Sequence, residues 1–307
     1  MVDYEILNPF ALLNEKIIHI SEAETGLNRD YLCPFCREAL IPRKGDINAH
    51  HFAHKSSSTN CVYGFEAAIH LMAKEILEQN KKMVLPVVYS KYSRGKRQPM
   101  CLFEEKEIEF DKVYVERRIN KIIPDIVVEI NGKCLLIEIF VTHKIDDIKR
   151  QKIIENEYPT IEINLSKYRR ERRERCGCEY SNSTQIRLDL ERILLSETEN
   201  KYWVYNPFQE YFDTNITLAT LCLEAKYDED YLRDEMGFKK SPVEVLLPRI
   251  NCLAEKNSVL VRECENCNYC MEIGKHNDYV LCSFNTKVTT LKELEEYLST
   301  SGEGRGG

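Results

Sequence analysis

Apolar residues recur every three to four positions between 63 and 79, and this spacing predicts one amphipathic helix. Its apolar stripe consists of Phe65, Ala68, Ile69, Met72, Ala73 and Ile76. Glu66, His70 and Lys74 follow one another at four-residue steps, so they should form a polar line at the edge of the buried face. Further along, the pattern predicts a strand at 83–90, a helix-prone charged run at 168–174 and a helix at 188–197.

Residues 121–143, KIIPDIVVEINGKCLLIEIFVTH, predict a β-hairpin. Two β-branched apolar runs flank Asn131-Gly132, the dipeptide that best accommodates the positive φ angles of a type I′ turn. If these two residues form the turn, Ile130 faces Lys133 and each outward step keeps the pairing. Asp125 then lies directly opposite Glu138.

Two opposed carboxylates are unusual in a strand pair that is otherwise Ile, Val and Leu. Directly opposed residues point to the same face with their Cβ atoms about 5 Å apart, where like charges repel. Burying both acids is costly unless a partner neutralises them. A divalent cation with a preference for oxygen ligands supplies such a partner, so Asp125 and Glu138 are predicted metal ligands. The alternative is a frayed strand end with solvated acids.

The chain of 307 residues is long enough for more than one core, and we expect three parts. These are a Cys/His zinc-binding module at 1–62, an α/β core at 63–200, and a helical region with a cysteine cluster at 201–307. The final SGEGRGG should be disordered. No apolar run approaches the roughly 20 residues that span a bilayer, and the start lacks a signal-like segment, so a cytoplasmic location without membrane association is expected.

The formal net charge is −7, yet basic residues are concentrated in two stretches. One is KYRRERRER at 167–175, and the other, at 81–98, has no acid and contains Lys81, Lys82, Lys91, Arg94, Lys96 and Arg97. Each stretch is suited either to a phosphate backbone or to a solvated surface.

Several of the 13 cysteines are clustered, which in a cytoplasmic chain indicates metal binding more often than disulfides. Near the N-terminus, a Cys-x₂-Cys pair precedes AHHFAH. The simplest tetrahedral set for structural Zn²⁺ is Cys33, Cys36, His51 and His54, with His50 or Cys61 as substitutes.

The second cluster consists of Cys264, Cys267, Cys270 and Cys282, with His276 inside it. It predicts a second, zinc-ribbon-like Zn²⁺ site. The alternatives are a redox-active or a buried set of thiols.

Pro124-Asp125 followed by Glu138 on the next strand resembles the signature of PD-(D/E)XK nucleases. The resemblance implies a restriction-endonuclease-like core in which both acids hold Mg²⁺ or Mn²⁺ for phosphodiester hydrolysis. The family usually places a lysine two residues after the second acid, where this chain has Phe140. We expect Lys149 to replace it, with Lys144 and Lys74 as further candidates.

The same resemblance implies that Glu66 supplies an additional acid from the preceding helix. His70, Lys74, Thr142 and Lys144 are candidates for contacts with nucleic acid, and His70 also for contact with the metal. The alternative for the helix residues is a solvated helix edge.

The ordered string CPFC, HFAH, Cys61, Glu66-x₃-His70-x₃-Lys74, Pro124-Asp125, IEIFVTH, IEINLS and Trp203 resembles CoiA-like competence-related proteins over residues 30–205. This resemblance implies a bacterial protein that handles incoming or foreign DNA, together with other DNA-processing or defence proteins. A metal-dependent deoxyribonuclease is the leading hypothesis. A non-catalytic, zinc-containing DNA-binding protein with a degenerate core and a metal- or redox-responsive regulator are the alternatives.

Overall fold

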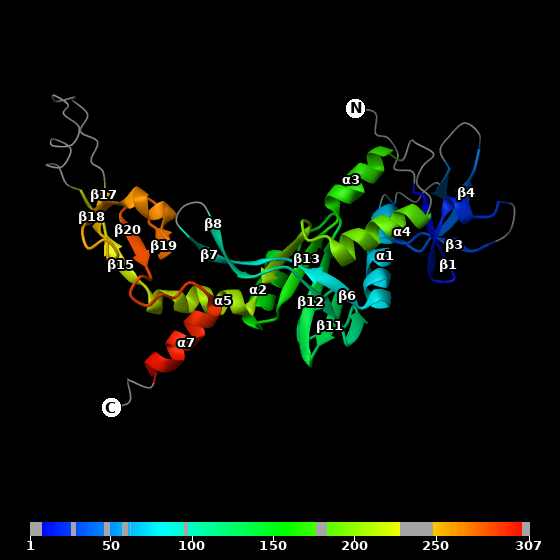
Figure 1. Ribbon diagram of the computed structural model, residues 1–307. Coiled ribbons are helices and arrows are strands. Elements are labelled where there is room, and N and C mark those ends of the chain that lie inside the picture. Colours follow the sequence, from blue (N-terminus) through cyan, green and yellow to red (C-terminus); the bar gives the residue numbers. More distant parts are fainter. Residues whose placement is uncertain are drawn as a thin grey trace, which may run out of the picture. The chain divides into compact units, whose positions relative to one another are not determined.

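The computed structural model describes residues 8–25, 29–45, 50–56, 61, 63–94, 98–175, 183–227 and 248–302. By contacts the chain forms two compact units (Figure 1). Unit 1 comprises Met1–Pro86 and Glu105–Asn206, and unit 2 comprises Val87–Glu104 and Pro207–Gly307. The predicted parts 1–62 and 63–200 therefore fall together in unit 1, except for residues 87–104. No helix among the described residues is long and apolar enough to cross a bilayer.

Unit 1 begins with a five-stranded antiparallel sheet in the order β2-β1-β3-β4-β5. Its strands are β1 (Phe10–Leu13), β2 (Lys16–His19), β3 (Tyr31–Leu32), β4 (Ala39–Arg43) and β5 (His51–His54), and η1 (Ile20–Glu22) is a 3-10 turn. Asn14 and Glu15 both adopt positive φ angles, which suits the two-residue turn between β1 and β2. Ala11, Tyr31 and Phe52 are buried in the core of this module.

The predicted amphipathic helix is confirmed as α1 (Gly64–Asn80). Every member of its apolar stripe is buried. The helix ends at Lys81, whose left-handed conformation lets its N–H bond to the Leu77 carbonyl.

The strand predicted at 83–90 is instead two strands that belong to different units. They are β6 (Lys82–Leu85), which pairs with β9 (Lys106–Glu109) in unit 1, and β7 (Val88–Arg94), which pairs with β8 (Gln98–Phe103) in unit 2. Pro86 lies at the break, and proline has no N–H to continue a ladder. The basic stretch 81–98 is thus divided between the units, and its residues 95–97 lie outside the described part of the chain.

A mixed five-stranded sheet forms the centre of unit 1, in the order β10-β11-β12-β13-β14. Its strands are β10 (Lys112–Val115), β11 (Ile126–Ile130), β12 (Lys133–Phe140), β13 (Thr160–Asn164) and β14 (Lys201–Tyr205). Figure 1 shows β11, β12 and β13 side by side. β12 pairs antiparallel with β11 and parallel with β13, and α2 (Asp147–Glu155) lies in the connection between β12 and β13.

Helices cover the two faces of this sheet. On one face, Ile137 and Ile139 of β12 pack with the apolar stripe of α1. On the other face, Leu136 packs with Ile153 of α2. Because successive strand residues alternate between faces, Glu138 and Phe140 belong to the α2 face.

The remaining helices of unit 1 agree in place with the sequence pattern. They are α3 (Ser166–Arg175), α4 (Ser183–Glu191) and the π-helical turn η2 (Arg192–Ser196). The charged run at 168–174 is helical as predicted, and the helix predicted at 188–197 corresponds to α4 and η2.

In unit 2, the described residues after 206 carry several strands, so the prediction of a mainly helical region was wrong. The helices are α5 (Pro207–Asn215), η3 (Ile216–Ala219), η4 (Val261–Asn266) and α7 (Leu291–Gly302). The strands are β15 (Leu221–Glu224), β16 (Lys226–Tyr227), β17 (Pro248–Asn251), β18 (Ser258–Leu260), β19 (Cys270–Ile273) and β20 (Tyr279–Cys282).

Short apolar runs separated by turn residues account for these strands. Asn277, for example, adopts a φ of 58° in the turn between β19 and β20. The first two residues of the predicted disordered tail end α7, and residues 303–307 lie outside the described part.

Candidate functional site

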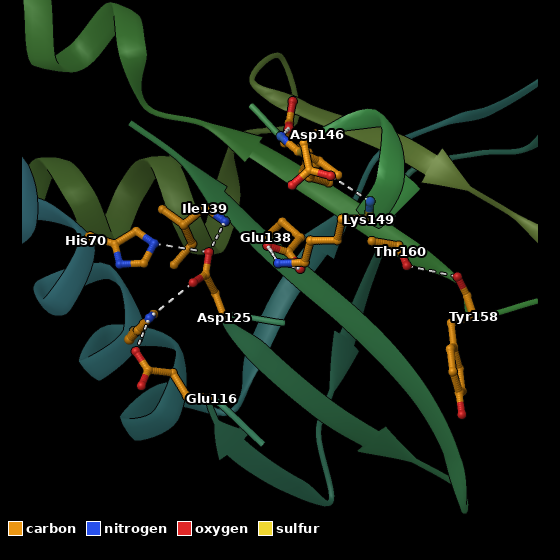
Figure 2. Close-up of polar contacts among 12 residues, drawn as sticks. His70, Glu116, Asp125, Glu138, Ile139, Asp146, Lys149, Tyr158 and Thr160 are labelled. Atoms are coloured by element: carbon orange, nitrogen blue, oxygen red, sulfur yellow. Dashed lines mark hydrogen bonds and ion pairs between the residues drawn. The ribbon is translucent and has the colours of Figure 1, made fainter. Parts of the chain in front are cut away.

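The predicted hairpin register is confirmed. Ile130 pairs with Lys133 and Ile126 with Ile137, and Asn131 and Gly132 both have positive φ, at 50° and 76°. Asp125 precedes β11 by one residue, so the next step of the same register faces Glu138. The N–H of Ile139 donates to Asp125 Oδ2 at 2.8 Å, which fixes the carboxylate against β12 (Figure 2).

Asp125 is surrounded by cationic and donor groups. His70 Nε2 lies 3.0 Å from Asp125 Oδ2, and Lys74 Nζ lies 3.1 Å from Oδ1. Lys74 is almost fully buried and also donates to Glu116 Oε1 at 2.7 Å. Burial raises the pKa of Asp125, but the hydrogen bond and charge of His70, the charge of Lys74 and the Ile139 N–H together hold it well below its usual range. Asp125 is therefore ionised at neutral pH.

Glu138 has the opposite titration behaviour. Lys149 Nζ lies 2.7 Å from Glu138 Oε1 and 2.8 Å from Oε2. Burial raises the pKa of Glu138 to about 7, and the charge of Lys149 offsets only part of this effect. Lys149 is held in place from its own helix, because the Asp146 side chain caps α2 by accepting the Lys149 N–H at 2.7 Å.

A cavity of about 200 Å³ adjoins these groups. Its lining includes His70, Asp125, Glu138, Lys149 and Glu162. Glu138 Oε1 is buried and accepts no hydrogen bond, since Lys149 Nζ is close to it but poorly directed. A buried carboxylate oxygen with unused lone pairs is a suitable ligand atom for a hard cation.

Glu162 is a site residue that the sequence analysis missed. It pairs directly with Glu138 across the parallel β12–β13 pair, so both acids lie on the α2 face, and its Oε2 accepts the Ile145 N–H at 3.1 Å. A signal was present in the sequence, since Ile-Glu-Ile occurs at 137–139 and again at 161–163. Each places one acid in a buried apolar strand.

Phe140 and Lys144 both line this cavity. Lys144 Nζ lies 5.6 Å from the centre of the Phe140 ring, a cation–π contact. Among the three candidate lysines, Lys149 contacts Glu138, Lys74 contacts Asp125, and Lys144 covers Phe140. Their catalytic roles stay predictions.

Glu66 is placed apart from the two acids. It belongs to α1, on the opposite face of β12 from Glu138, and its Oε2 accepts the Thr142 hydroxyl at 2.7 Å. Its other oxygen forms an ion pair with Arg169. These contacts support a structural role for Glu66 and Thr142, and their predicted roles toward metal and phosphate stay predictions.

We expect Glu66→Ala to lower the free energy of unfolding by about 3 kcal/mol, because it leaves the Arg169 guanidinium without its partner. This figure is the lower end of the range for a broken buried pair, since the Arg169 side chain keeps 21% exposure. Urea unfolding measures the loss. Thr142→Val removes one neutral donor to the same carboxylate and should cost about 1 kcal/mol. Equal stability of Glu66→Ala and wild type would contradict the structural role.

The N-terminal metal site has a different ligand set from the simplest one predicted. Ligand atoms of Cys33, Cys36, His54 and Cys61 all lie within 4.8 Å of one another. Cys61, the predicted substitute, takes the place of His51. The reason is strand alternation: His51 and His54 are three residues apart on β5, so they point to opposite faces of the sheet.

Three thiols and one imidazole are a favourable tetrahedral set for Zn²⁺. The Cys33 and Cys61 sulfurs are 3.8 Å apart, and the Cys36 sulfur is 3.3 Å from His54 Nε2. Burial raises the pKa of the Cys33 thiol to about 12, so a thiolate at this position requires a cation beside it. The donor chemistry and spacing of these four residues therefore fit a structural zinc ion.

The C-terminal cysteines gather around η4, β19 and β20. Cys270 pairs with Cys282 between β19 and β20, and Cys264 and Cys270 are buried in one core. Burial and the neighbouring thiols, including Cys252, raise the pKa of Cys264 to about 12. Within the described residues, the Cys33 cluster is the group of three or more potential ligands that meets within 4.8 Å. The second zinc site stays a prediction, and Asp125, Glu138 and Glu66 do not form such a group either.

Comparison with known proteins gives a family match for the N-terminal module. No curated protein and no solved structure matches the chain significantly. Residues 16–64, which contain β2, β3, β4 and β5 and all four residues of the Cys/His cluster, match the family model of the N-terminal domain of competence protein CoiA. The N-terminal module is thus similar to the N-terminal domain of CoiA, and this similarity favours a competence-related role.

Proposed function

We propose that this protein is a metal-dependent nuclease that hydrolyses phosphodiester bonds in incoming or foreign DNA, with its site in the cavity that Asp125, Glu138 and Lys149 line. The observation that carries the proposal is the contact of Lys149 with Glu138 in a cavity that Asp125 also lines. A helix thus supplies a lysine to the second acid, whereas the usual strand position holds Phe140. The CoiA-like N-terminal module supports a role in handling DNA.

The order of elements also supports a PD-(D/E)XK-like core. α1 precedes an antiparallel strand pair, and α2 then connects β12 to a parallel neighbour. Asp125 and Glu138 come from the two strands of the hairpin and line one cavity, where Asp125 pairs with His70 and Lys74 of α1 and Glu138 pairs with Lys149 of α2.

Asp125 and Glu138 would hold Mg²⁺ or Mn²⁺. Two facing carboxylates, one of them with an unused buried oxygen, fit a hard divalent cation. When bound, the ion supplies Lewis-acid stabilisation of the phosphate and an activated water. His70 and the Ile139 N–H orient Asp125, and Lys149 holds Glu138 and presents a positive charge to the reacting phosphate.

The direct test is cleavage of labelled linear, circular and single-stranded DNA with Mg²⁺ or Mn²⁺. Under the proposal, cutting requires the added metal and disappears in Glu138→Gln. Cutting that is independent of metal, or equal in both proteins, would overturn it.

A second candidate is a non-catalytic DNA-binding protein with a degenerate core. It is favoured by the ion pairs of Lys74 with Asp125 and of Lys149 with Glu138, which neutralise the acids without a metal. Phe140 in the usual lysine position favours it as well. No cleavage of any substrate, with DNA binding intact in wild type and Glu138→Gln, would support this candidate.

The affinity for Mn²⁺ should depend on pH through Glu138. Because the pKa of this buried carboxyl is about 7, a proton competes with the metal below that pH. Affinity should therefore fall about tenfold per pH unit below about pH 7 and level off above it. Asp125 remains ionised over this range and does not contribute to the pH dependence of Mn²⁺ affinity.

Calorimetric titration between about pH 5.5 and about pH 8.5 measures this dependence. A flat profile below about pH 7 would contradict the assignment. In the metal-free protein, the same shift lowers stability as pH rises from 4.5 to about 7, because the folded state holds the proton more tightly than the unfolded chain.

A further inference from the structure

A second cavity in unit 1 lies on the α1 face of β12. It has a volume of about 450 Å³, within the usual range for small-molecule sites. Apolar side chains form much of its wall, among them Ala67, Ile139 and Val141. Nothing in the proposed hydrolysis uses this cavity.

Two exposed aromatic rings stand at this cavity. Phe35 is 57% exposed and Tyr63 is 43% exposed, whereas large aromatic residues are usually more deeply buried. Their ring centroids are 5.2 Å apart at an interplanar angle of 51°. Phe35 lies between the zinc-cluster residues Cys33 and Cys36, and Tyr63 immediately precedes α1. Phe35 therefore belongs to the N-terminal Cys/His module, and Tyr63 stands at the start of α1.

The two cavities adjoin each other around the end of β12. Their linings share His70, Ile139 and His143. One side of this shared wall is apolar and aromatic, and the other carries Asp125 and Glu138. The two cavities thus provide neighbouring sites, one for a planar apolar group and one for a phosphate. His70 and His143 lie between them.

We infer that the aromatic cavity receives an unpaired nucleobase of a single-stranded DNA substrate, whose phosphate reaches the carboxylate cavity. This inference rests on the proposed nuclease function and names its substrate class. A base inside a duplex is stacked on both faces, so it cannot enter a cavity beside exposed rings without leaving the helix. Single-strand binding proteins commonly stack bases on aromatic side chains in this way.

Hydrogen-bond donors near the cavities suit a polynucleotide occupant, and a bound divalent cation would offset the carboxylates Asp125, Glu138, Asp146 and Glu162. His70 and His143 contribute to both linings, and Lys144 lines the carboxylate cavity. Each can donate a hydrogen bond to a phosphate. An apolar metabolite would use the rings but would have no use for these hydrogen-bond donors.

The test compares the binding of labelled dT15, a blunt 15-bp duplex and a fully abasic 15-mer to the full chain, all in a Glu138→Gln background that prevents cutting. Tyr63→Ala should weaken binding of dT15 by about 5- to 150-fold, the effect of losing one base–aromatic stack. Binding of the abasic strand, which keeps the phosphates but has no base, should not change. Duplex binding should stay within about twofold, because no base is available to stack.

Phe35→Leu provides a second variant that keeps an apolar side chain between the zinc-cluster cysteines, and its zinc content shows whether the module is intact. The control is Phe103→Ala, which removes an exposed ring from the Phe103–Phe208 pair of unit 2. It should leave dT15 binding unchanged.

The inference would be overturned if Tyr63→Ala weakened binding of dT15 and of the abasic strand equally, or if it did not weaken binding of dT15. Failure of the nuclease proposal is a separate result. In that case the wild-type protein cleaves no substrate, while Tyr63→Ala still weakens binding of dT15 and leaves binding of the abasic strand unchanged. Conversely, Glu138-dependent cutting with unchanged dT15 binding in Tyr63→Ala would retain the nuclease and reject the base cavity.

Discussion

Glu138→Gln is expected to lower the rate of metal-dependent DNA cleavage by about 10²- to 10³-fold or more. The substitution keeps the shape of the side chain but removes the charge that would bind the cation. A catalytic metal supplies several kcal/mol of stabilisation to the transition state, and each 1.36 kcal/mol is a factor of ten in rate. The measurement is initial cleavage rate at saturating Mn²⁺ and a pH above about 8, where the wild-type carboxyl is ionised.

Glu129→Gln is the matched control for this prediction. Glu129 lies on the same hairpin, close to the turn, and pairs with Lys112 at 3.1 Å. Its loss should change the cleavage rate by less than about twofold, because an exposed ion pair contributes little. Comparable losses in both variants would indicate damage to the hairpin and would contradict a specific role for Glu138.

Cys61→Ala is expected to abolish stoichiometric zinc binding and to lower the melting temperature of unit 1 by about 10 °C. Loss of a structural metal belongs to the small class of changes that cost about 4 kcal/mol or more. For a domain of this size, each kcal/mol corresponds to roughly 2–4 °C. Zinc content by elemental analysis and thermal unfolding by calorimetry measure the two effects.

His51→Ala separates the observed ligand set from the simplest predicted one. His51 lies on the opposite face of β5 from His54, so the variant should keep one zinc ion per chain. Zinc loss in His51→Ala together with zinc retention in Cys61→Ala would reverse the assignment.

The hairpin was the most predictable part of the site. A two-residue Asn-Gly turn fixes its own register, so pairing Ile130 with Lys133 determines every outward pair up to Asp125 and Glu138. The α1 stripe was predictable for a similar reason, because a single helix repeats with a known period. The Asp146 cap of α2 is likewise a local feature, and it sets Lys149 in the first turn of that helix.

Features that depend on contacts distant in sequence could not be predicted in this way. The parallel pairing that sets Glu162 beside Glu138 arises from a crossover through α2, and nothing local encodes its register. The ion pair between Arg169 and Glu66 also joins residues far apart in sequence, so the local pattern does not predict it. For the zinc site, three-residue spacing suggested His51 and His54 as a pair, but that spacing suits a helix, and the segment is a strand.

The hairpin β7–β8 is synthesised long before the residues against which it packs. Tyr92 and Met100 of the hairpin are buried with Phe212, Met271 and Leu294, all of which leave the ribosome much later. At about 5–20 residues per second, the apolar face of the hairpin waits roughly 10–40 s for the last of these partners. Unit 1 can complete its own core during that interval, so the nascent chain carries a folded site while the hairpin is still unprotected. We therefore expect the nascent protein to depend on a chaperone that shields this segment until translation ends.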